Sequence, residues 1–299
     1  MWQQLWRFVY LGLIHPLVKW ILHRLTGKCE LQRILSSKEC GARRTQKIEE
    51  SLEMSKHKEL RRILQNDDVN VEEAVKDVMR IKSINPDIDT KFHLMMTKCL
   101  HQICGYKELL RVIEITRKEP YSSDNPKHEI LLLQLWGTLC PDDKLESRIS
   151  KQWGDIGFQG DDPMTDFRGM GILGLLNLVF LVTKHTNAAK QLLSHSTHPQ
   201  YGYSFAIVGI NITGLVYHLL TGGYLKTHFY NAIEGRPTLE HFHGVYCHFF
   251  WDFDQFWRDE KPKDIMQFNV IKDKYEEKMK TKLKGDKDAV LKGVFTQMV

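Results

Sequence analysis

Apolar residues recur at the three- and four-residue spacing of an α-helix along most of this chain of 299 residues, and no segment alternates convincingly between polar and apolar side chains. This pattern leaves little room for a sheet, so we predict an all-α fold. Asn70 is expected to cap one helix, with Glu73 as its capping-box partner, and this helix ends at the break formed by Pro86. Asp142 or Asp143 is expected to cap another, which runs to about 153. The remaining helices are expected over 43–65, 90–118, 128–140, 170–183, 187–195, 201–221, 238–258 and 264–284.

Composition excludes several protein classes. Hydrophobic residues make up 42% and charged residues 26% of the chain, which rules out a disordered chain, a collagen and a short disulfide scaffold. The net charge of +5 is only mildly basic, and the aromatic run 242–257 has no interleaved basic patch, so we predict no nucleic-acid partner. The six cysteines are irregularly spaced without a CxxC pair, which favours a reduced, cytoplasmic location.

Residues 1–25 combine aromatic, aliphatic and basic side chains. Three tryptophans, Trp2, Trp6 and Trp20, alternate with leucines and with Arg7, Lys19 and Arg24. The apolar stretch 8–18 is too short to span a bilayer. Two interpretations remain open: a helix that lies in a membrane interface through the tryptophans, and an amphipathic helix that packs on the rest of the protein.

A second segment is apolar enough to raise the membrane question. No Lys, Arg, Asp or Glu occurs from Gln191 to Leu225, and the core of this window, 201–220, is long enough to cross a bilayer. It contains Ser204, Asn211, Thr213 and His218, which are costly in lipid. We therefore predict a buried helix of a large α-domain.

Two patterns typical of cofactor sites fail their structural requirements. Gly169, Gly171 and Gly174 match GxGxxG, but a polar loop precedes them and no acidic residue follows at the distance that a dinucleotide site needs. The histidines and cysteine of 241–248 would bring only two ligands together on either helix face. We predict neither a bound nucleotide nor a metal.

The loop 153–174 contains the strongest functional signal that residue chemistry provides. Asp166, assisted by Thr165, is expected to cap the following helix, which places Arg168 in the first helical turn. A cation there faces the positive end of the helix dipole, which is electrostatically unfavourable. An unfavourable placement without a visible compensating interaction indicates a functional site. The alternative is that Arg168 pairs with Asp161, Asp162 or Asp166 and locks the loop. Residue chemistry leaves both open.

The same loop carries a family resemblance. The ungapped sequence WGDIGFQGDDPMTDFRGMGILGLLNL, over 153–178, closely resembles the signature of the ELMO-domain family, and HPQYGYSFAIVGINIT (198–213) and TGKCELQRI (26–34) are similar to the same family. The resemblance implies a single large helical ELMO domain over 127–284, preceded by an N-terminal helical region over 26–126 and followed by a tail, 285–299.

The resemblance also implies a function. Short members of this family activate Arf-family GTPases, both Arf and Arf-like, whereas larger members serve as scaffolds for exchange factors. The arginine required in the activating members corresponds to Arg168, supplied in trans. GTP and Mg²⁺ would belong to the partner GTPase, so we expect no cofactor and no hydrolase activity of the chain alone. The alternative is a non-enzymatic scaffold that binds a small GTPase or its exchange factor.

The other loop residues are expected to shape the loop or contact the partner. Anchoring, turn-forming and partner-contact roles are assigned to Trp153, Gly157, Phe158, Gln159, Gly160, Pro163, Thr165, Asp166, Phe167 and Gly169. The expected setting is membrane traffic, with the protein peripheral on the cytosolic face of endomembranes such as the Golgi or the ER.

Overall fold

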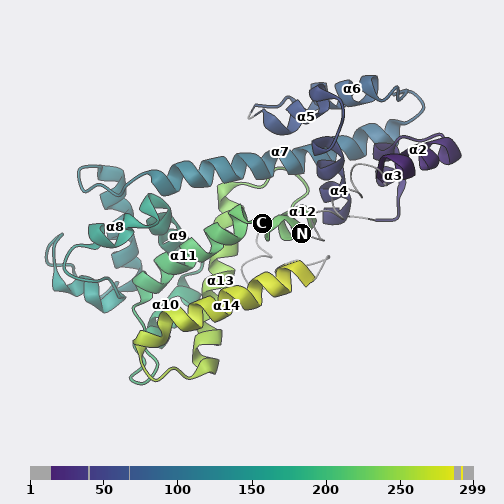
Figure 1. The fold of residues 1–299 in the computed structure, drawn as a ribbon. Helices are drawn as coiled ribbons and strands as arrows, with labels where there is room; N and C mark the ends of the chain where they lie inside the picture. The colour runs from purple at the N-terminus through teal and green to yellow at the C-terminus, as the bar shows by residue number, and fades with distance from the viewer. Residues whose placement is uncertain (1–14, 40, 67, 286–290, 292–299) are drawn as a thin grey trace. The chain divides into compact units, whose positions relative to one another are not determined.

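This computed structural model describes residues 15–39, 41–66, 68–285 and 291, and among them every regular element is a helix and no strand occurs (Figure 1). The predicted all-α class is therefore confirmed. The chain divides into two compact units: Met1–Gly105 with Tyr230–Arg236, and Tyr106–Phe229 with Pro237–Val299. The domain boundary expected at 126/127 falls inside the second unit.

The first unit is built from short helices. They are α2 (His15–Thr26), α3 (Glu30–Ser36), α4 (Gly41–Glu53), α5 (Lys58–Gln65), α6 (Val71–Ile81) and the first half of α7 (Thr90–Lys118). The predicted single helix over 43–65 is wrong, because the Ser55 hydroxyl accepts a hydrogen bond from the His57 N–H at 3.2 Å and a local turn replaces the helical bond. Asn70 caps α6 as predicted by accepting from the Glu73 N–H at 3.4 Å.

A later segment of the chain completes the first unit. The Asn231 side chain accepts from the Ala42 N–H at 2.7 Å, and the Gln102 amide donates to the Tyr230 carbonyl at 2.9 Å. Asn231 lies in α12 (Lys226–Ala232), a helix that the sequence analysis did not anticipate.

The second unit is organised around one buried helix. Its elements after α7 are α8 (Pro126–Leu139), the 3₁₀ helices η2 (Lys151–Ile156) and η3 (Pro163–Arg168), α9 (Gly171–Lys184), α10 (Thr186–Ser196), α11 (Phe205–Thr221), α13 (Leu239–Glu260), η4 (Ile265–Gln267) and α14 (Phe268–Gly285). Helix α9 contacts α8, α10, α11, α13 and η3. Because most residues of α9 are apolar and buried, this helix forms the centre of the core.

The uncharged segment around 201–220 forms α11. Most of its side chains are buried inside the unit, and its polar Thr213 accepts a hydrogen bond from the buried Asn177 amide at 3.0 Å. Among the described residues no single helix is long and apolar enough to cross a membrane. Two sharply bent helix pairs, α9 with α10 and α11 with α12, reach the required length and composition only together.

The helix predicted from Asp142 or Asp143 to about 153 does not form. Residues 141–150 make turns and bends, because side chains replace the helical partners of the backbone. The Trp136 indole donates to the Asp143 carbonyl at 2.9 Å, and the Gln152 side chain bonds both the Glu146 N–H at 2.9 Å and the Lys144 carbonyl at 3.1 Å. A long loop therefore leads from α8 to η2.

Candidate functional site

The loop that carries the family signature is anchored by aromatic side chains. Trp153, Phe158 and Phe167 are buried, and their rings form a continuous series, with centroids 5.8 Å apart for Trp153 and Phe158 and 5.7 Å apart for Phe158 and Phe167. Phe167 also stacks on Tyr121 at 5.3 Å. The Trp153 indole donates to the Arg148 carbonyl at 2.9 Å. These three buried rings thus fix the loop to the core and make it rigid.

The two glycines that follow η2 differ in what surrounds them. Both have left-handed backbones, with φ of +82° at Gly157 and +79° at Gly160. A Cβ on Gly157 would lie 2.2 Å from the Phe205 nitrogen at the start of α11, whereas a Cβ on Gly160 would meet nothing within 4 Å. The Gly157 carbonyl also accepts from the Ile207 N–H at 3.2 Å. At 157 a glycine is therefore favoured both by the left-handed backbone and by the close contact with α11, whereas at 160 it is favoured by the left-handed backbone alone.

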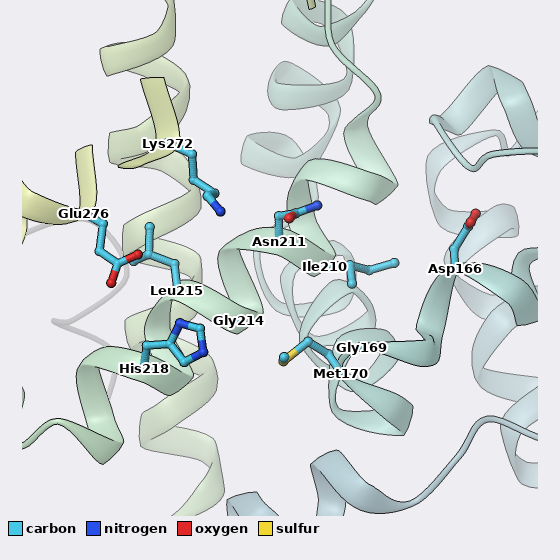
Figure 2. Close-up of a pocket in the computed structure, with 10 residues that line it drawn as sticks. All are labelled: Asp166, Gly169, Met170, Ile210, Asn211, Gly214, Leu215, His218, Lys272 and Glu276. Carbon is cyan, nitrogen blue, oxygen red and sulfur yellow. The ribbon is translucent and has the colours of Figure 1, made fainter. Parts of the chain in front are cut away.

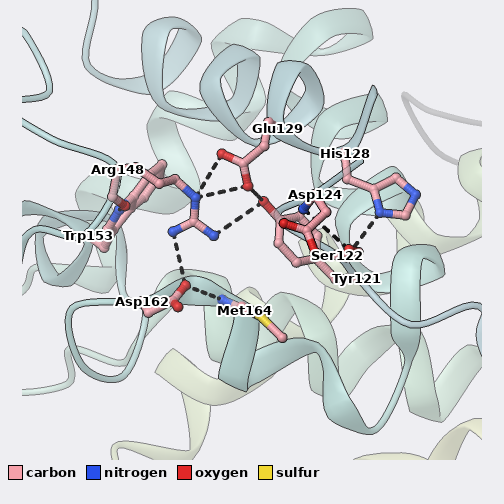
Figure 3. A network of polar contacts seen from close by, with 9 residues as sticks. All are labelled: Tyr121, Ser122, Asp124, His128, Glu129, Arg148, Trp153, Asp162 and Met164. Carbon is pink, nitrogen blue, oxygen red and sulfur yellow. Dashed lines mark hydrogen bonds and ion pairs between the residues drawn. The ribbon is translucent and has the colours of Figure 1, made fainter. Parts of the chain in front are cut away.

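A network centred on Arg148 holds the loop to α8 (Figure 3). The Arg148 Nε donates to both Glu129 oxygens, at 2.9 and 2.8 Å, and Nη1 donates to Asp162 Oδ1 at 2.9 Å. Nη2 lies 3.4 Å from the Tyr121 hydroxyl, which itself donates to Glu129. Burial and the bond to Glu129 raise the pKa of Tyr121, so this hydroxyl keeps its proton. Arg148 and its partners are mostly buried, and the network locks the loop.

Sequence reasoning missed Arg148. The lock hypothesis paired Arg168 with acids of its own loop and did not consider an arginine outside the signature. The available signal was Asp162, whose carboxylate needs a cation once it is partly buried, together with the nearest upstream arginine. The other partner, Glu129, lies on α8 and could not be identified without the fold.

Asp162, rather than Asp166, provides the helix cap in this loop. Asp162 Oδ1 accepts from the Met164 N–H at 3.0 Å, Pro163 occupies the first position of η3 and is buried, and the Thr165 hydroxyl donates to the Asp162 carbonyl at 3.2 Å. Asp166 Oδ2 instead accepts from the Gln159 N–H at 2.8 Å, and α9 begins after Met170 with no side-chain cap. The predicted capping of α9 by Asp166 and Thr165 is wrong.

Arg168 occupies the last position of η3 and is exposed. It therefore precedes α9 instead of lying in the first turn, and the predicted conflict with the helix dipole does not arise. Within the described part of the chain, Arg168 makes no hydrogen bond or ion pair, including with Asp161, Asp162 or Asp166. Gly169, which follows it, has φ of −79°, a value open to any residue. Gln159 is also exposed.

The carboxyl of Asp166 interacts electrostatically with Arg168. Burial raises the pKa of Asp166, while the bond from the Gln159 N–H and the positive charge of Arg168 lower it. Asp166 thus acts on Arg168 through space, without a contact that would fix the guanidinium.

A cavity of about 300 Å³ lies between η3 and α14, along α11 (Figure 2). Asp166 lies at one end of the cavity, and His218, Lys272 and Glu276 lie at the other, as Figure 2 shows. Between these ends the wall is made by Gly169, by Met170 and by four residues of α11: Ile210, Asn211, Gly214 and Leu215. We call this the α11–α14 pocket.

The histidines and cysteine of 241–248 each have different surroundings. His241 bonds Thr238 at the start of α13, His243 Nδ1 lies 2.6 Å from Asn177 Oδ1, and Cys247 and His248 are buried. Burial lowers the pKa of His243 to about 4, so it is neutral at physiological pH. No group of three potential metal ligands occurs among the residues that the structure describes.

Helix α2 exposes much of its apolar surface. Trp20 is 62% and Leu25 76% exposed, and Leu17, Val18, Ile21 and Leu22 are exposed as well. Trp2 and Trp6, the other residues predicted to contact a membrane, lie outside the described residues, as do 286–290 and 292–299 of the expected tail.

Comparison with known proteins identifies the family. The model of the ELMO/CED-12 family matches residues 111–272. The chain is 51% identical to human ELMO domain-containing protein 2, over 94% of this chain and 95% of that protein, and 45% identical to human ELMO domain-containing protein 1, over 91% and 89%. It is 38% identical to ELMO domain-containing protein B of Dictyostelium discoideum, over 87% and 92%. No solved structure matches the chain. The chain therefore belongs to the ELMO/CED-12 family, and this membership supports a role related to the regulation of small GTPases.

Proposed function

We propose that this protein stimulates GTP hydrolysis by Arf-family small GTPases, Arf or Arf-like, and that Arg168 supplies positive charge to the transferring phosphoryl group. One observation carries the proposal: Arg168 is exposed and free of partners among the described residues, yet it is the last residue of a helix fixed by buried rings and by the Arg148 network. An arginine supplied in trans must be both available and held in place.

The physical case rests on where charge develops during hydrolysis. In the loose transition state, negative charge is spread over the three equatorial oxygens of the γ-phosphoryl group and develops on the leaving oxygen. A positioned guanidinium stabilises this charge, which raises the hydrolysis rate of small GTPases by about 10³–10⁵. The planar fork of arginine can bridge two of these oxygens. GTP and Mg²⁺ belong to the partner GTPase, and the chain is not a hydrolase by itself.

The decisive experiment is single-turnover hydrolysis of GTP by a panel of Arf-family GTPases, with and without the purified protein. We expect stimulation of at least one member, and none by Arg168→Lys under the same conditions. The protein without a GTPase should neither bind nor hydrolyse GTP. Binding to the GTPase or to its exchange factor without any stimulation would support the alternative, a non-enzymatic scaffold.

The exposed apolar residues of α2 support a second proposal, peripheral association with the cytosolic face of an endomembrane such as the Golgi or the ER. Trp20 and Leu25 are exposed, and the helix carries Lys19 and Arg24 but no acidic residue. Deletion of residues 1–25 should abolish flotation with liposomes while activation in solution persists. Trp20→Glu should weaken flotation in the otherwise intact chain, and equal flotation of all three proteins would contradict the proposal.

A further inference from the structure

Helix α9 begins directly against residues 117–122, which we call the α7 end. Its first residue, Gly171, is buried and has a left-handed backbone with φ of +53°. A Cβ at this position would lie 2.3 Å from both the Arg117 and the Glu119 carbonyl oxygens, a distance far below van der Waals contact. The Ile172 N–H donates to the Glu119 carbonyl at 2.8 Å. Only glycine therefore suits both the backbone conformation and the close approach at this position.

This contact provides partners for two helix ends at once. The first N–H groups of a helix and its last carbonyl groups have no partner inside the helix, and α9 has no side-chain cap. The Glu119 carbonyl, just beyond the C-terminus of α7, supplies the missing acceptor. The negative end of the α7 dipole also lies beside the positive end of α9, which is electrostatically favourable. The α7 end thus takes the place of the absent cap.

The α7 end is itself held in place from two sides. Arg117 Nε and Nη2 donate to the two Glu114 oxygens, both at 2.9 Å, and the Tyr217 hydroxyl of α11 donates to Glu114 at 2.7 Å. The Arg117 guanidinium lies 5.0 Å from the centre of the Tyr217 ring. From α8, the buried His128 accepts from the Ser122 N–H at 3.1 Å through Nδ1 (Figure 3). The α7 end is therefore fixed to both α8 and α11.

The turn that carries Arg168 is attached to the α7 end both before and after this residue. Before it, the buried Phe167 ring stacks on Tyr121 of the α7 end, with centroids 5.3 Å apart. After it, Gly171 and Ile172 contact the main chain of the same segment. Arg168 has no bonded partner of its own among the described residues, so the position of its backbone depends on these neighbours.

We infer that the α7 end positions Arg168 for the phosphoryl group of the GTPase, and that Gly171 is the residue that allows this contact. The inference rests on the proposed function. A guanidinium accelerates hydrolysis only where it meets the developing charge, and a displacement of about 1 Å can cost about a hundredfold in rate. Because Gly171 is buried, it is a positioning residue and acts on the partner only through the turn that it holds.

The test compares two glycines that occupy the same local position in different helices. Gly171→Ala adds a Cβ at a φ of +53° and 2.3 Å from two carbonyl oxygens. Gly41→Ala is the matched control: Gly41 is the first residue of α4 in the first unit, has φ of +56°, and would place a Cβ 2.1 Å from Asn231 Oδ1. Both variants are made in the full chain and assayed well below their melting temperatures, so that folded proteins are compared.

Single-turnover hydrolysis is measured at saturating protein, and the dissociation constant is measured with the same GTPase loaded with a nonhydrolysable GTP analogue. We expect Gly171→Ala to lower the stimulated rate about ten- to hundredfold while the dissociation constant stays close to that of wild type. Gly41→Ala should lower the melting temperature and keep the rate. A wild-type rate in Gly171→Ala, or an equal loss of rate in both variants, overturns the inference.

A milder variant decides the case in which Gly171→Ala does not fold. Glu114→Ala removes the acceptor that holds Arg117, at a partly exposed position where alanine favours the helix. It should lower the stimulated rate less than Gly171→Ala, again with an unchanged dissociation constant. A wild-type rate in Glu114→Ala then overturns the inference.

Backbone amide relaxation at Arg168 provides a readout that needs no GTPase. The order parameter of this amide should be lower in Gly171→Ala and Glu114→Ala than in wild type and Gly41→Ala. If wild type stimulates no GTPase, the proposed function fails, and this measurement still tests the attachment of the turn. A lower order parameter then shows that the α7 end holds Arg168, whereas an unchanged order parameter in both variants overturns that attachment as well.

Discussion

Arg148 and Arg168 border the same loop and differ in almost every physical respect. Arg148 is mostly buried, and its guanidinium is engaged by Glu129, Asp162 and Tyr121. Arg168 is exposed and has no bonded partner among the described residues. The first arginine fixes the loop, and because it does so the second is not needed for that purpose.

The acids of the loop explain why the two arginines diverge. Asp162 is bonded to Arg148 and to the Met164 N–H, and Asp166 is bonded to the Gln159 N–H. Asp162 and Asp166, two of the three acids considered as partners of Arg168, are thus already bonded to other donors. An arginine left unpaired beside satisfied carboxylates is available to a negative charge that arrives with a partner.

The largest effect is expected at Arg168. Under the proposed function, Arg168→Ala and Arg168→Lys should each lower the stimulated hydrolysis rate by about 10³–10⁵, because neither places a planar fork on the phosphoryl oxygens. The free energy of unfolding should stay within about 0.5 kcal/mol of wild type, as for an exposed residue without partners. Single-turnover rates and thermal melts are measured on the same preparations.

Two outcomes would contradict this contrast between Arg148 and Arg168. Full stimulation by Arg168→Ala would remove the catalytic role of this arginine. A clearly lowered melting temperature in both variants would mean that Arg168, like Arg148, holds the loop.

The next largest effect is expected at Gly157, where the loop meets α11. Gly157→Ala would place its Cβ 2.2 Å from the Phe205 nitrogen at a φ of +82°, and the strain and the clash together should cost about 2–5 kcal/mol. Gly160→Ala has the same backbone sign without the clash and should cost about 1–2 kcal/mol. Denaturant unfolding measures both, and equal costs would show that contact with α11 does not constrain the loop.

Arg148→Ala should destabilise the fold by about 2–3 kcal/mol, because it leaves the carboxylates of Glu129 and Asp162 without their cation. Loss of one partner from a fully buried ion pair costs about 3–5 kcal/mol, and the cost here is smaller because these side chains are 20–34% exposed. Arg148→Lys keeps the charge but cannot reach both carboxylates with one fork, so its loss should be smaller. Unfolding and hydrolysis are measured together. Stability and activity should fall in parallel here, in contrast to Arg168, and wild-type stability of Arg148→Ala would refute the lock.

The fold could be predicted from the sequence where a helix is specified locally. The apolar periodicity of α10 and α11 and the Asn70 cap of α6 predicted these helices to within a few residues, because the signals lie in or next to each segment. The break at Ser55 and the absent helix over 142–153 depend on side chains that bond the backbone in competition with the helix. The spacing of apolar residues carries no information about such side-chain-to-backbone hydrogen bonds.

The candidate site could be predicted only in part, for a related reason. The family resemblance of 153–178 directed the prediction to this loop and to Arg168, whereas the argument from residue chemistry placed Arg168 in the first turn of α9, which is wrong. Whether Arg168 is paired or free depends on Arg148 and Glu129, which come from outside the signature and meet only in the fold. The α11–α14 pocket joins three segments far apart in the sequence, and no local pattern indicates it.

The smallest effect concerns the electrostatic link between Asp166 and Arg168. Burial raises the pKa of Asp166 above its ordinary 3.8, and Arg168 opposes this rise. Arg168→Ala should therefore raise the pKa of Asp166 further, while Arg168→Lys, which keeps the charge, should change it less. A carboxyl with a raised folded pKa contributes stability that is complete below its unfolded pKa and is lost as the pH rises through the folded pKa. Arg168→Ala should accordingly lose slightly more stability than wild type as the pH rises through this range.

NMR titration of the Asp166 carboxyl at low and high salt measures the shift, which salt should reduce because Arg168 is exposed. An identical pKa in wild type and Arg168→Ala would show that the guanidinium points away from Asp166 and that the two groups of the loop act independently.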